Sequence, residues 1–190
     1  MSPIEREIKQ CIMVLSSGGT LLYPTDTIWG IGCDATNFIA VEKVHRLKKK
    51  MERKNLIILL DKAEKIKDFV TDIPEIAWDL IKNVSTPLTI IYPNAKNLAA
   101  NVISDDKSIA IRIVKNDFCK RLINEFGKPI VSTSANISGI NAPRVFKDIS
   151  SEIINGVDWV VDESLEQLGQ VKASRIIKLN LNGEFRIVRQ

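Results

Sequence analysis

Two short clusters of hydroxyl side chains follow apolar segments that we expect to be strands. One is Pro24-Thr25-Asp26-Thr27, and the other is Ser132-Thr133-Ser134-Ala135-Asn136. In α/β proteins, ligands bind beyond the carboxyl ends of strands, where such side chains and free backbone N–H groups converge. Hydroxyls and amides there suit a polar, partly anionic small molecule. Either cluster alone is more simply a cap for the turn that follows it, but the two together favour a ligand site.

A dense basic segment lies between the two clusters. Arg46 to Lys54 reads RLKKKMERK, with six basic residues against Glu52. Its local charge is therefore +5, whereas the whole chain has a formal net charge of +4. Lysines near the end of a helix can simply complement its dipole and stay solvated. However, this segment leads directly into the apolar run NLIILL, so we expect its lysines to lie near the sheet, where they can bind a triphosphate.

Arg112 is the other informative charge. It lies in the apolar stretch SIAIRIV, at a position where alternation would otherwise direct an apolar side chain towards a core. A buried arginine is costly unless it meets a carboxylate or a phosphate. Two interpretations are equally open at this point: an internal ion pair with an Asp or Glu, or a contact with an anionic ligand.

Several kinds of chemistry are excluded by what the chain contains. Cys11, Cys33 and Cys119 are widely spaced and form no C-x-x-C pair, which argues against a disulfide framework and a thiolate zinc site. His45 is the only histidine, and its segment VEKVHRL indicates a helix, where we expect it to pack. We therefore expect no metal ion held by protein side chains. Neither a Walker-type phosphate loop nor a dinucleotide fingerprint occurs.

Composition predicts one globular domain over residues 1–190. The chain is 45% apolar and 26% charged, which is ordinary for such a domain. No apolar run approaches the length of a membrane-spanning helix, and the charged N-terminus lacks the apolar core of a secretion signal. We expect a cytoplasmic protein that makes no membrane contact.

Apolar periodicity predicts the elements that position these residues. Expected helices begin behind Pro3, at Asn37, at Asp61 as an N-cap, at Pro74 and at Asp117, the last one ending at Gly127. Expected strands are TLLYP, NLIILL, LTIIYP, SIAIRIV, PIVSTS, WVVDE, SRIIKLN and EFRIVR, the last two joined as a hairpin across Asn182-Gly183. Helices that alternate with strands, followed by a hairpin, indicate an α/β fold with a mixed sheet.

Five sequence blocks resemble the signature blocks of the YrdC-like L-threonylcarbamoyl-AMP synthases. The blocks are YPTDTIWGIGCDA, RLKKKMERKNLIIL, TPLT, SIAIRI and KPIVSTSANISG, and their order and spacing fit over essentially the whole chain. The resemblance implies a twisted open α/β sheet, mixed parallel and antiparallel and flanked by helices, with a deep concave groove.

The resemblance also implies roles for individual residues. Residues expected to hold L-threonine are Thr27, Leu59, Arg112, Ser132 and Ser174. Residues expected at the ATP site are Lys50, Lys54, Ser108, Ser134, Asn136, Ala142 and Arg189, with Asn136 supporting the surrounding loop. Lys48 and Lys50 occupy the positions of the family's K-x-R motif and are the expected catalytic cations. Arg112 would pair with the carboxylate of the amino acid.

The implied activity is that of a nucleotidyltransferase. L-threonine takes up bicarbonate or CO2 as a carbamate, which then attacks the α-phosphorus of ATP and expels pyrophosphate. ATP would arrive with Mg2+, and no protein nucleophile is needed, because alignment and charge neutralisation suffice. The product would pass to a separate transferase complex that modifies adenosine 37 of certain tRNAs. A direct contact between this chain and tRNA is left open.

Four departures from the family pattern concern mainly the ATP site. Lys50 stands where arginine is usual and so keeps the charge without the bidentate fork. Met51 replaces a proline, Ser85-Thr86 replace Pro-Gly, and Arg175 follows Ser174 where threonine is more usual. Two alternatives therefore stay open: an RNA-binding module that uses the same basic groove, and a paralogue of the family with another substrate.

Overall fold

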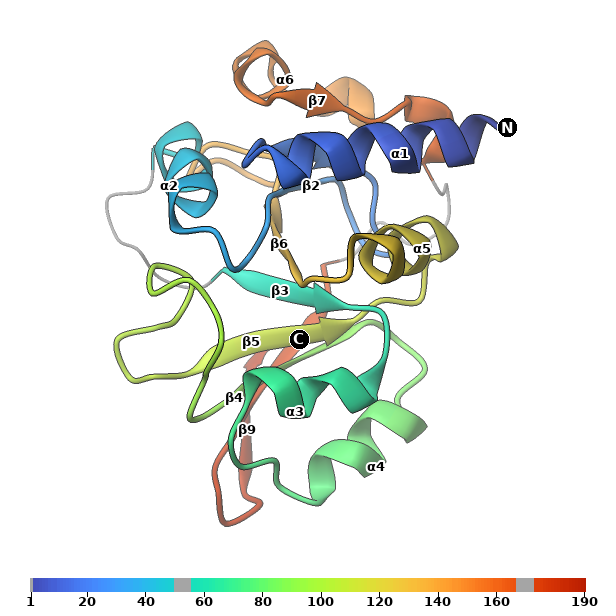
Figure 1. Cartoon of the computed structure of the whole chain (residues 1–190). Coiled ribbons are helices and arrows are strands. Elements are labelled where there is room, and N and C mark those ends of the chain that lie inside the picture. The colour runs from blue at the N-terminus through green and yellow to red at the C-terminus, as the bar shows by residue number, and fades with distance from the viewer. Residues whose placement is uncertain (1, 50–55, 167–172) are drawn as a thin grey trace.

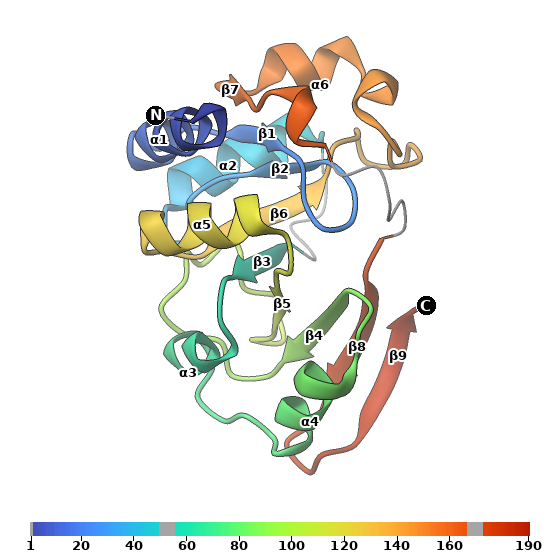
Figure 2. The ribbon, with the colours of Figure 1, turned by 90° about the vertical axis from the view of Figure 1, so that its right-hand side faces the viewer.

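The computed structural model describes residues 2–49, 56–166 and 173–190. Within these ranges, nine strands form a sheet in the order β7-β1-β2-β6-β3-β5-β4-β8-β9 (Figures 1 and 2). The strands are β1 (Leu21–Tyr23), β2 (Gly30–Gly32), β3 (Ile57–Leu60), β4 (Leu88–Tyr92), β5 (Ile109–Ile113), β6 (Ile130–Ser134), β7 (Trp159–Val160), β8 (Arg175–Leu179) and β9 (Phe185–Arg189).

The sheet is mixed and open, as predicted. The pairs β1–β7, β3–β5 and β4–β8 are parallel, and the other neighbouring pairs are antiparallel. The hairpin predicted around Asn182-Gly183 joins β8 to β9 in antiparallel register. The helices that flank the sheet are α1 (Pro3–Ser16), α2 (Phe38–Leu47), α3 (Ile66–Phe69), α4 (Ile76–Asn83), α5 (Asp117–Phe126) and α6 (Ser151–Gly156), with 3-10 turns at Ala63–Lys65, Phe146–Asp148 and Glu163–Leu165.

Side-chain caps fix the starts of the three longest helices. Ser2 and Glu5 form a reciprocal capping box on α1. Asn37 Oδ1 accepts hydrogen bonds from the N–H groups of Ile39 and Ala40 at 3.0 and 3.1 Å, which confirms the predicted cap of α2. Asn116 caps α5, which ends at Gly127 with a φ of 76°.

Asp61 is not the predicted helix cap. The 3-10 turn that follows it has Lys62 at its N-cap position and no side-chain capping bond. The Asp61 carboxylate instead lies 2.7 Å from Lys65 Nζ, one helical turn further along the chain. The carboxylate is therefore neutralised by a lysine rather than by backbone N–H groups.

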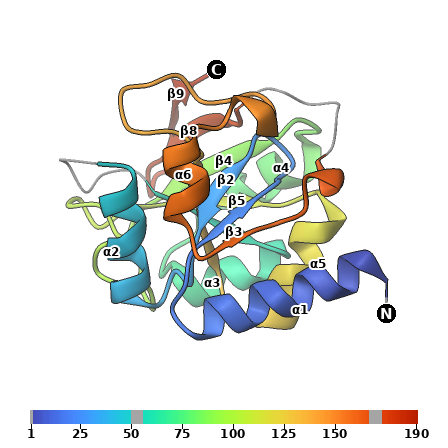
Figure 3. The same cartoon turned by 90° about the horizontal axis from the view of Figure 1, so that it is seen from above.

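Two apolar cores lie on opposite faces of the sheet. Alternate residues of β3 and β5, such as Ile58 and Ile111, face a core shared with α2, α3 and α4. Residues on the opposite face, such as Leu59 of β3 and Ile130 of β6, face a second core shared with α1 and α5. Figure 3, seen from above, shows α1 and α5 lying next to each other at one side of the molecule.

The histidine and the three cysteines are packed in the interior of the protein. His45 is buried in α2, and its Nε2 lies 3.1 Å from the carbonyl oxygen of Asn101. The three cysteines are free and buried, and burial raises the pKa of the Cys11 thiol to about 12. In the parts of the chain described, no helix is long and apolar enough to span a lipid bilayer.

Candidate functional site

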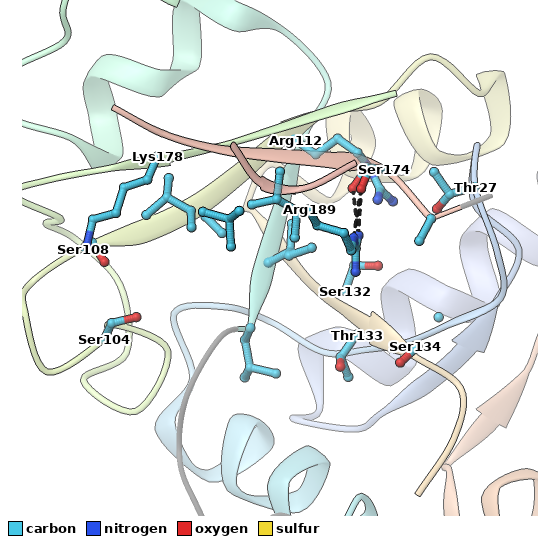
Figure 4. Close-up of a pocket in the computed structure, with 18 of the residues that line it drawn as sticks. Thr27, Ser104, Ser108, Arg112, Ser132, Thr133, Ser134, Ser174, Lys178 and Arg189 are labelled. Carbon is cyan, nitrogen blue, oxygen red and sulfur yellow. Dashed lines mark hydrogen bonds between the residues drawn. The ribbon is translucent and has the colours of Figure 1, made fainter. Parts of the chain in front are cut away.

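A cavity of about 670 Å³, lined by polar and apolar side chains (Figure 4), opens on the face of the sheet that faces the second core. Helices α1 and α5 cover part of this face, over β1, β3 and β6. The cavity lies on the part of the same face that these helices leave uncovered. Much of its wall comes from alternate residues of four strands: Ile57 of β3, Ala110 and Arg112 of β5, Ile91 of β4, and Ile176 and Lys178 of β8. Three successive residues of β6, Ser132 to Ser134, and residues of β9 also contribute. The alternation of a β-strand thus separates cavity from core.

Two guanidinium groups mark one end of the cavity. Arg112 is 4% exposed, and its Nε lies 3.4 Å from Asp26 Oδ1. Arg189 donates from Nε and Nη2 to the carbonyl oxygen of Ser174, at 3.0 and 2.8 Å (Figure 4). Burial, together with the nearby charge of Arg112, lowers the pKa of Arg189. Among the described residues, Arg112 and Arg189 lie at this end with the carboxylate of Asp26, and this excess of positive charge favours an anionic ligand.

The structure confirms the internal ion pair of Arg112, whereas its contact with an anionic ligand stays a prediction. The side chain makes an internal ion pair with Asp26, and it also lines the cavity. The hydrogen bond from its Nη2 to Thr25 Oγ1 is long, at 3.4 Å. Its Nε lacks a well-aligned hydrogen-bond acceptor among the described residues. Its neighbours thus hold the Arg112 side chain in place but leave part of its hydrogen-bonding capacity unused.

Hydroxyl groups surround the guanidinium end. Thr27, Ser132 and Ser174 are buried to more than nine-tenths yet line the cavity. Figure 4 shows Ser174 and Ser132 close to Arg189, with Thr27 on the neighbouring wall. The two hydroxyl-rich segments recognised in the sequence, 24–27 and 132–136, thus meet at one site, because β6 pairs with β2 immediately after the first cluster.

The other end of the cavity carries a second polar group. Asp106 accepts hydrogen bonds from the N–H and hydroxyl of Ser108, and its Oδ2 lies 2.5 Å from Lys178 Nζ. The bond to Lys178, with those to Ser108, lowers the pKa of Asp106 to about 2. Figure 4 shows Ser108 and Lys178 well apart from Arg112 and Ser174. Apolar side chains such as Ile91 and Ile176 line the region between them.

Most of the predicted site residues that can be located meet in this cavity. They are Thr27, Ser108, Arg112, Ser132, Ser134, Ser174 and Arg189. Lys50 and Lys54 lie outside the described residues. Lining positions that sequence reasoning missed include Trp29, Asp106 and Lys178. The alternation of an apolar strand could have identified Lys178. It lies two residues after Ile176, on the same face of β8, as Arg112 lies two residues after Ala110 on β5.

Leu59 does not lie where it was predicted. It is absent from the cavity wall and is fully buried in the core under α1 and α5, with Tyr23 and Phe118. It shares a sheet face with Ile57, which does line the cavity. The difference arises because Leu59 lies further along β3, where α5 covers the sheet.

Lys48, Asn136 and Ala142 lie beside the cavity rather than in its wall. The Lys48 ammonium is buried and donates to the carbonyl oxygens of Ser134 and Asn136 at 2.6 and 2.7 Å. The Asn136 amide donates to the carbonyl oxygen of Ile140, so it braces the following turn. Ala142 is exposed in the loop beyond. Lys48 and Asn136 thus support the chain around Ser134, outside the cavity wall.

The fold and cavity define an α/β protein whose polar site lies on an open face of a mixed sheet, without a phosphate loop. The chain belongs to the Sua5/YciO/YrdC family, described as telomere recombination, which matches residues 13–190. Two relatives are named threonylcarbamoyl-AMP synthase. The one from Pseudoalteromonas translucida (strain TAC 125) is 35% identical over 161 residues, covering 83% of this chain and 86% of the relative. The one from Idiomarina loihiensis is 31% identical over 172 residues, covering 88% and 91%.

Solved structures show the same fold. E. coli YciO superimposes with a TM-score of 0.82 at 23% identity, covering 98% of this chain and 89% of that one. P. abyssi Sua5 complexed with L-threonine gives a TM-score of 0.81 at 25% identity, covering 90% of this chain. The chain spans about half the length of that Sua5, of which 50% is covered.

Proposed function

We propose that this protein is an L-threonylcarbamoyladenylate synthase, which forms threonylcarbamoyl-AMP and pyrophosphate from L-threonine, bicarbonate or CO2, and ATP. Relatives that align with most of the chain carry this name, and a structural neighbour was solved with L-threonine. The observation that carries the proposal is that Arg112, Ser132, Ser174 and Arg189 line one cavity. A guanidinium surrounded by hydroxyls suits the carboxylate of an amino acid.

The reaction assigned to this cavity is a nucleotidyl transfer. The amine nitrogen of threonine bonds to the carbon of CO2 and loses a proton, which gives the carbamate. A carbamate oxygen then bonds to the α-phosphorus of ATP, the bond from that phosphorus to the α,β-bridging oxygen breaks, and pyrophosphate leaves. The protein contributes alignment and positive charge rather than a covalent intermediate. Lys50 and Lys54 are the proposed phosphate-binding cations, and the Mg2+ that accompanies ATP would add further charge.

The size and lining of the cavity suit small polar ligands. A volume of about 670 Å³ falls in the range of roughly 300–1,000 Å³ typical of sites for small molecules. Its apolar floor between Arg112 and Lys178 suits a nucleobase, and Ser108, Ser134 and Arg189 offer donors to the rest of a nucleotide. Threonine would occupy the guanidinium end, beside Thr27 and Arg112.

The cellular role that we propose follows from this product. Threonylcarbamoyl-AMP would pass to a tRNA threonylcarbamoyl transferase complex that completes the N6-threonylcarbamoyladenosine at position 37. We further propose that residues 1–190 act as one YrdC-like domain in the cytoplasm. The alternative of an RNA-binding module gains no support from Lys48, because its ammonium is buried against backbone carbonyls.

Pyrophosphate release from ATP tests the proposal directly. We expect release that requires both L-threonine and bicarbonate, with threonylcarbamoyl-AMP detected by mass spectrometry. L-serine, which lacks the methyl group, is the matched control and should support slower release. Equal release with serine, or release without bicarbonate, would indicate a paralogue with another substrate. RNA binding that persists in Arg112→Ala, without any ATP turnover, would instead favour the RNA-binding alternative.

A further inference from the structure

Two pairs of hydroxyl groups connect the cavity wall to residues behind it. Ser174 and Thr27 line the cavity, whereas their partners Thr89 and Thr25 do not belong to its wall. Thr89 Oγ1 lies 2.7 Å from Ser174 Oγ, and Thr25 Oγ1 lies 2.9 Å from Thr27 Oγ1. A hydroxyl has one proton to donate and two lone pairs that accept. The neighbours of each pair therefore decide which way its hydrogen bond runs.

The pair formed by Thr89 and Ser174 has a defined direction. Thr89 has no exposed surface, and Ser174 is the partner that the described residues provide for its hydroxyl. If Ser174 donated to Thr89, the Thr89 proton would be buried without an acceptor, a state that is costly in a protein interior. Thr89 must therefore donate to Ser174.

A second donor fills the remaining acceptor site of Ser174. Arg189 Nη2 lies 3.3 Å from Ser174 Oγ, in addition to its bond to the carbonyl oxygen of the same residue. With Thr89 and Arg189 both donating to it, the Ser174 oxygen has no free lone pair. Its own proton then has one place left to go, which is the cavity.

In the pair formed by Thr25 and Thr27, the residue behind the cavity does not donate to the residue in its wall. Thr25 Oγ1 lies 2.8 Å from the carbonyl oxygen of Ile28, and since a carbonyl only accepts, Thr25 must donate its proton there. Thr27 therefore cannot accept a hydrogen bond from Thr25, whose oxygen also accepts from the Thr27 N–H at 3.1 Å. The lone pairs of the Thr27 hydroxyl are left for the cavity. One end of the site thus presents an acceptor at Thr27 and a donor at Ser174.

We propose that Thr89 is a positioning residue for amino-acid binding: by donating to Ser174, it makes that hydroxyl a one-way donor to the ligand carboxylate. This rests on the proposed function and specifies how its amino-acid site is oriented. The carboxylate lies towards Ser174 and Arg112, where donors converge. A donor group of the amino acid, its nitrogen or its hydroxyl, lies towards Thr27.

The test compares Thr89→Val, which removes the hydroxyl and keeps the shape, with Thr89→Ser, which keeps the hydroxyl. We expect Thr89→Val to raise the KM for L-threonine about fivefold, the effect of losing one hydrogen bond of ordinary strength. The KM for ATP should change less than about twofold, and Thr89→Ser should restore threonine affinity. In a Ser174→Ala background, Thr89→Val should have no further effect on the threonine KM.

The outcomes separate this inference from the proposed function. An active wild-type enzyme in which Thr89→Val keeps a normal threonine KM would overturn the role of Thr89 and leave the synthase activity standing. Additive effects of Thr89→Val and Ser174→Ala, or equal increases in the KM for both substrates, would also overturn it. A wild-type protein without threonine-dependent pyrophosphate release would overturn both. Thermal unfolding of each variant shows whether the folded fraction is the same.

Discussion

Arg112 Nε lies 3.4 Å from Asp26 Oδ1, and both side chains are less than one-tenth exposed. The contact joins the loop after β1 to the middle of the sheet, at a point where β5 pairs with β3 and β4. Asp26 also accepts a hydrogen bond from the N–H of Lys115, so the carboxylate is anchored from the side of β5. Arg112 is therefore held in its orientation before any ligand arrives, which reduces the cost of ordering it on binding.

Replacing Arg112 by alanine should mainly raise the requirement for threonine. Loss of a charge-assisted contact to a carboxylate is worth about 2 kcal/mol, or roughly a 30-fold increase in the KM for threonine. Arg112→Lys keeps the charge but not the planar fork, so its KM for threonine should lie between those of the wild type and Arg112→Ala. Steady-state pyrophosphate release at varied threonine measures this. An increase of the same size in the KM for ATP would contradict the assignment.

Lys50→Ala should show the converse pattern. This residue belongs to the basic segment that we assign to the phosphates, so its loss should raise the KM for ATP about tenfold or more. The KM for threonine should stay nearly constant. Lys50→Arg, which gives the residue usual in the family, is the matched control and should retain or improve ATP use. The same pyrophosphate measurement, with ATP varied, distinguishes these results.

Lys48→Met should act chiefly on stability. The substitution keeps an unbranched chain but leaves the buried carbonyl oxygens of Ser134 and Asn136 without their charged donor. We expect a loss of about 2–4 kcal/mol in the free energy of unfolding. Lys49→Met is the control, because Lys49 is mostly exposed and pairs with Glu152 at the surface; it should cost less than about 1 kcal/mol. Urea denaturation of the two variants gives both values, and equal losses would argue against the internal role of Lys48.

The Asp106–Lys178 pair should give a dependence of stability on acid pH. The folded protein lowers the pKa of Asp106 from its ordinary value of 3.8 to about 2, so the ionised form is favoured by folding. This stabilisation is fully present above pH 4 and is lost as the pH falls towards 2. Because both side chains are partly exposed, we expect no more than about 1 kcal/mol. The stability difference between wild type and Asp106→Asn, measured by urea denaturation, should shrink over that interval. A constant difference would contradict the pairing.

Much of the fold could be predicted from local patterns. Apolar runs located β3, β4, β5 and β6, and Asn37 and Gly127 marked helix ends, because these signals act over a few residues. The strand β2 was missed, since Gly30-Ile31-Gly32 has no strand pattern. Its glycines answer a tertiary requirement: a Cβ at Gly32 would lie 2.5 Å from the Tyr23 ring and 2.6 Å from the carbonyl oxygen of Val131. Contacts between segments about 100 residues apart cannot be read from either segment alone.

The candidate site shows the same limit. Residue types indicated an anion site near Arg112 and the two hydroxyl clusters, and the structure brings those residues to one cavity. The pattern of charges could not distinguish Lys48, whose ammonium bonds to the backbone, from a lysine directed at a ligand. Nor could apolar alternation show that helix α5 covers Leu59 while Ile57, two residues earlier, stays at the cavity wall.

The alternation that separates cavity from core makes the site sensitive to chain length within strands. Deleting or inserting one residue in the middle of β5 would rotate its second half, so that Arg112 would exchange places with Ile111. A guanidinium would then enter the apolar layer under α3, and an isoleucine would replace it among the hydroxyls. Loops that lie away from the cavity can therefore be lengthened without loss of the site, but the central strands can change only by substitution if the site is to persist.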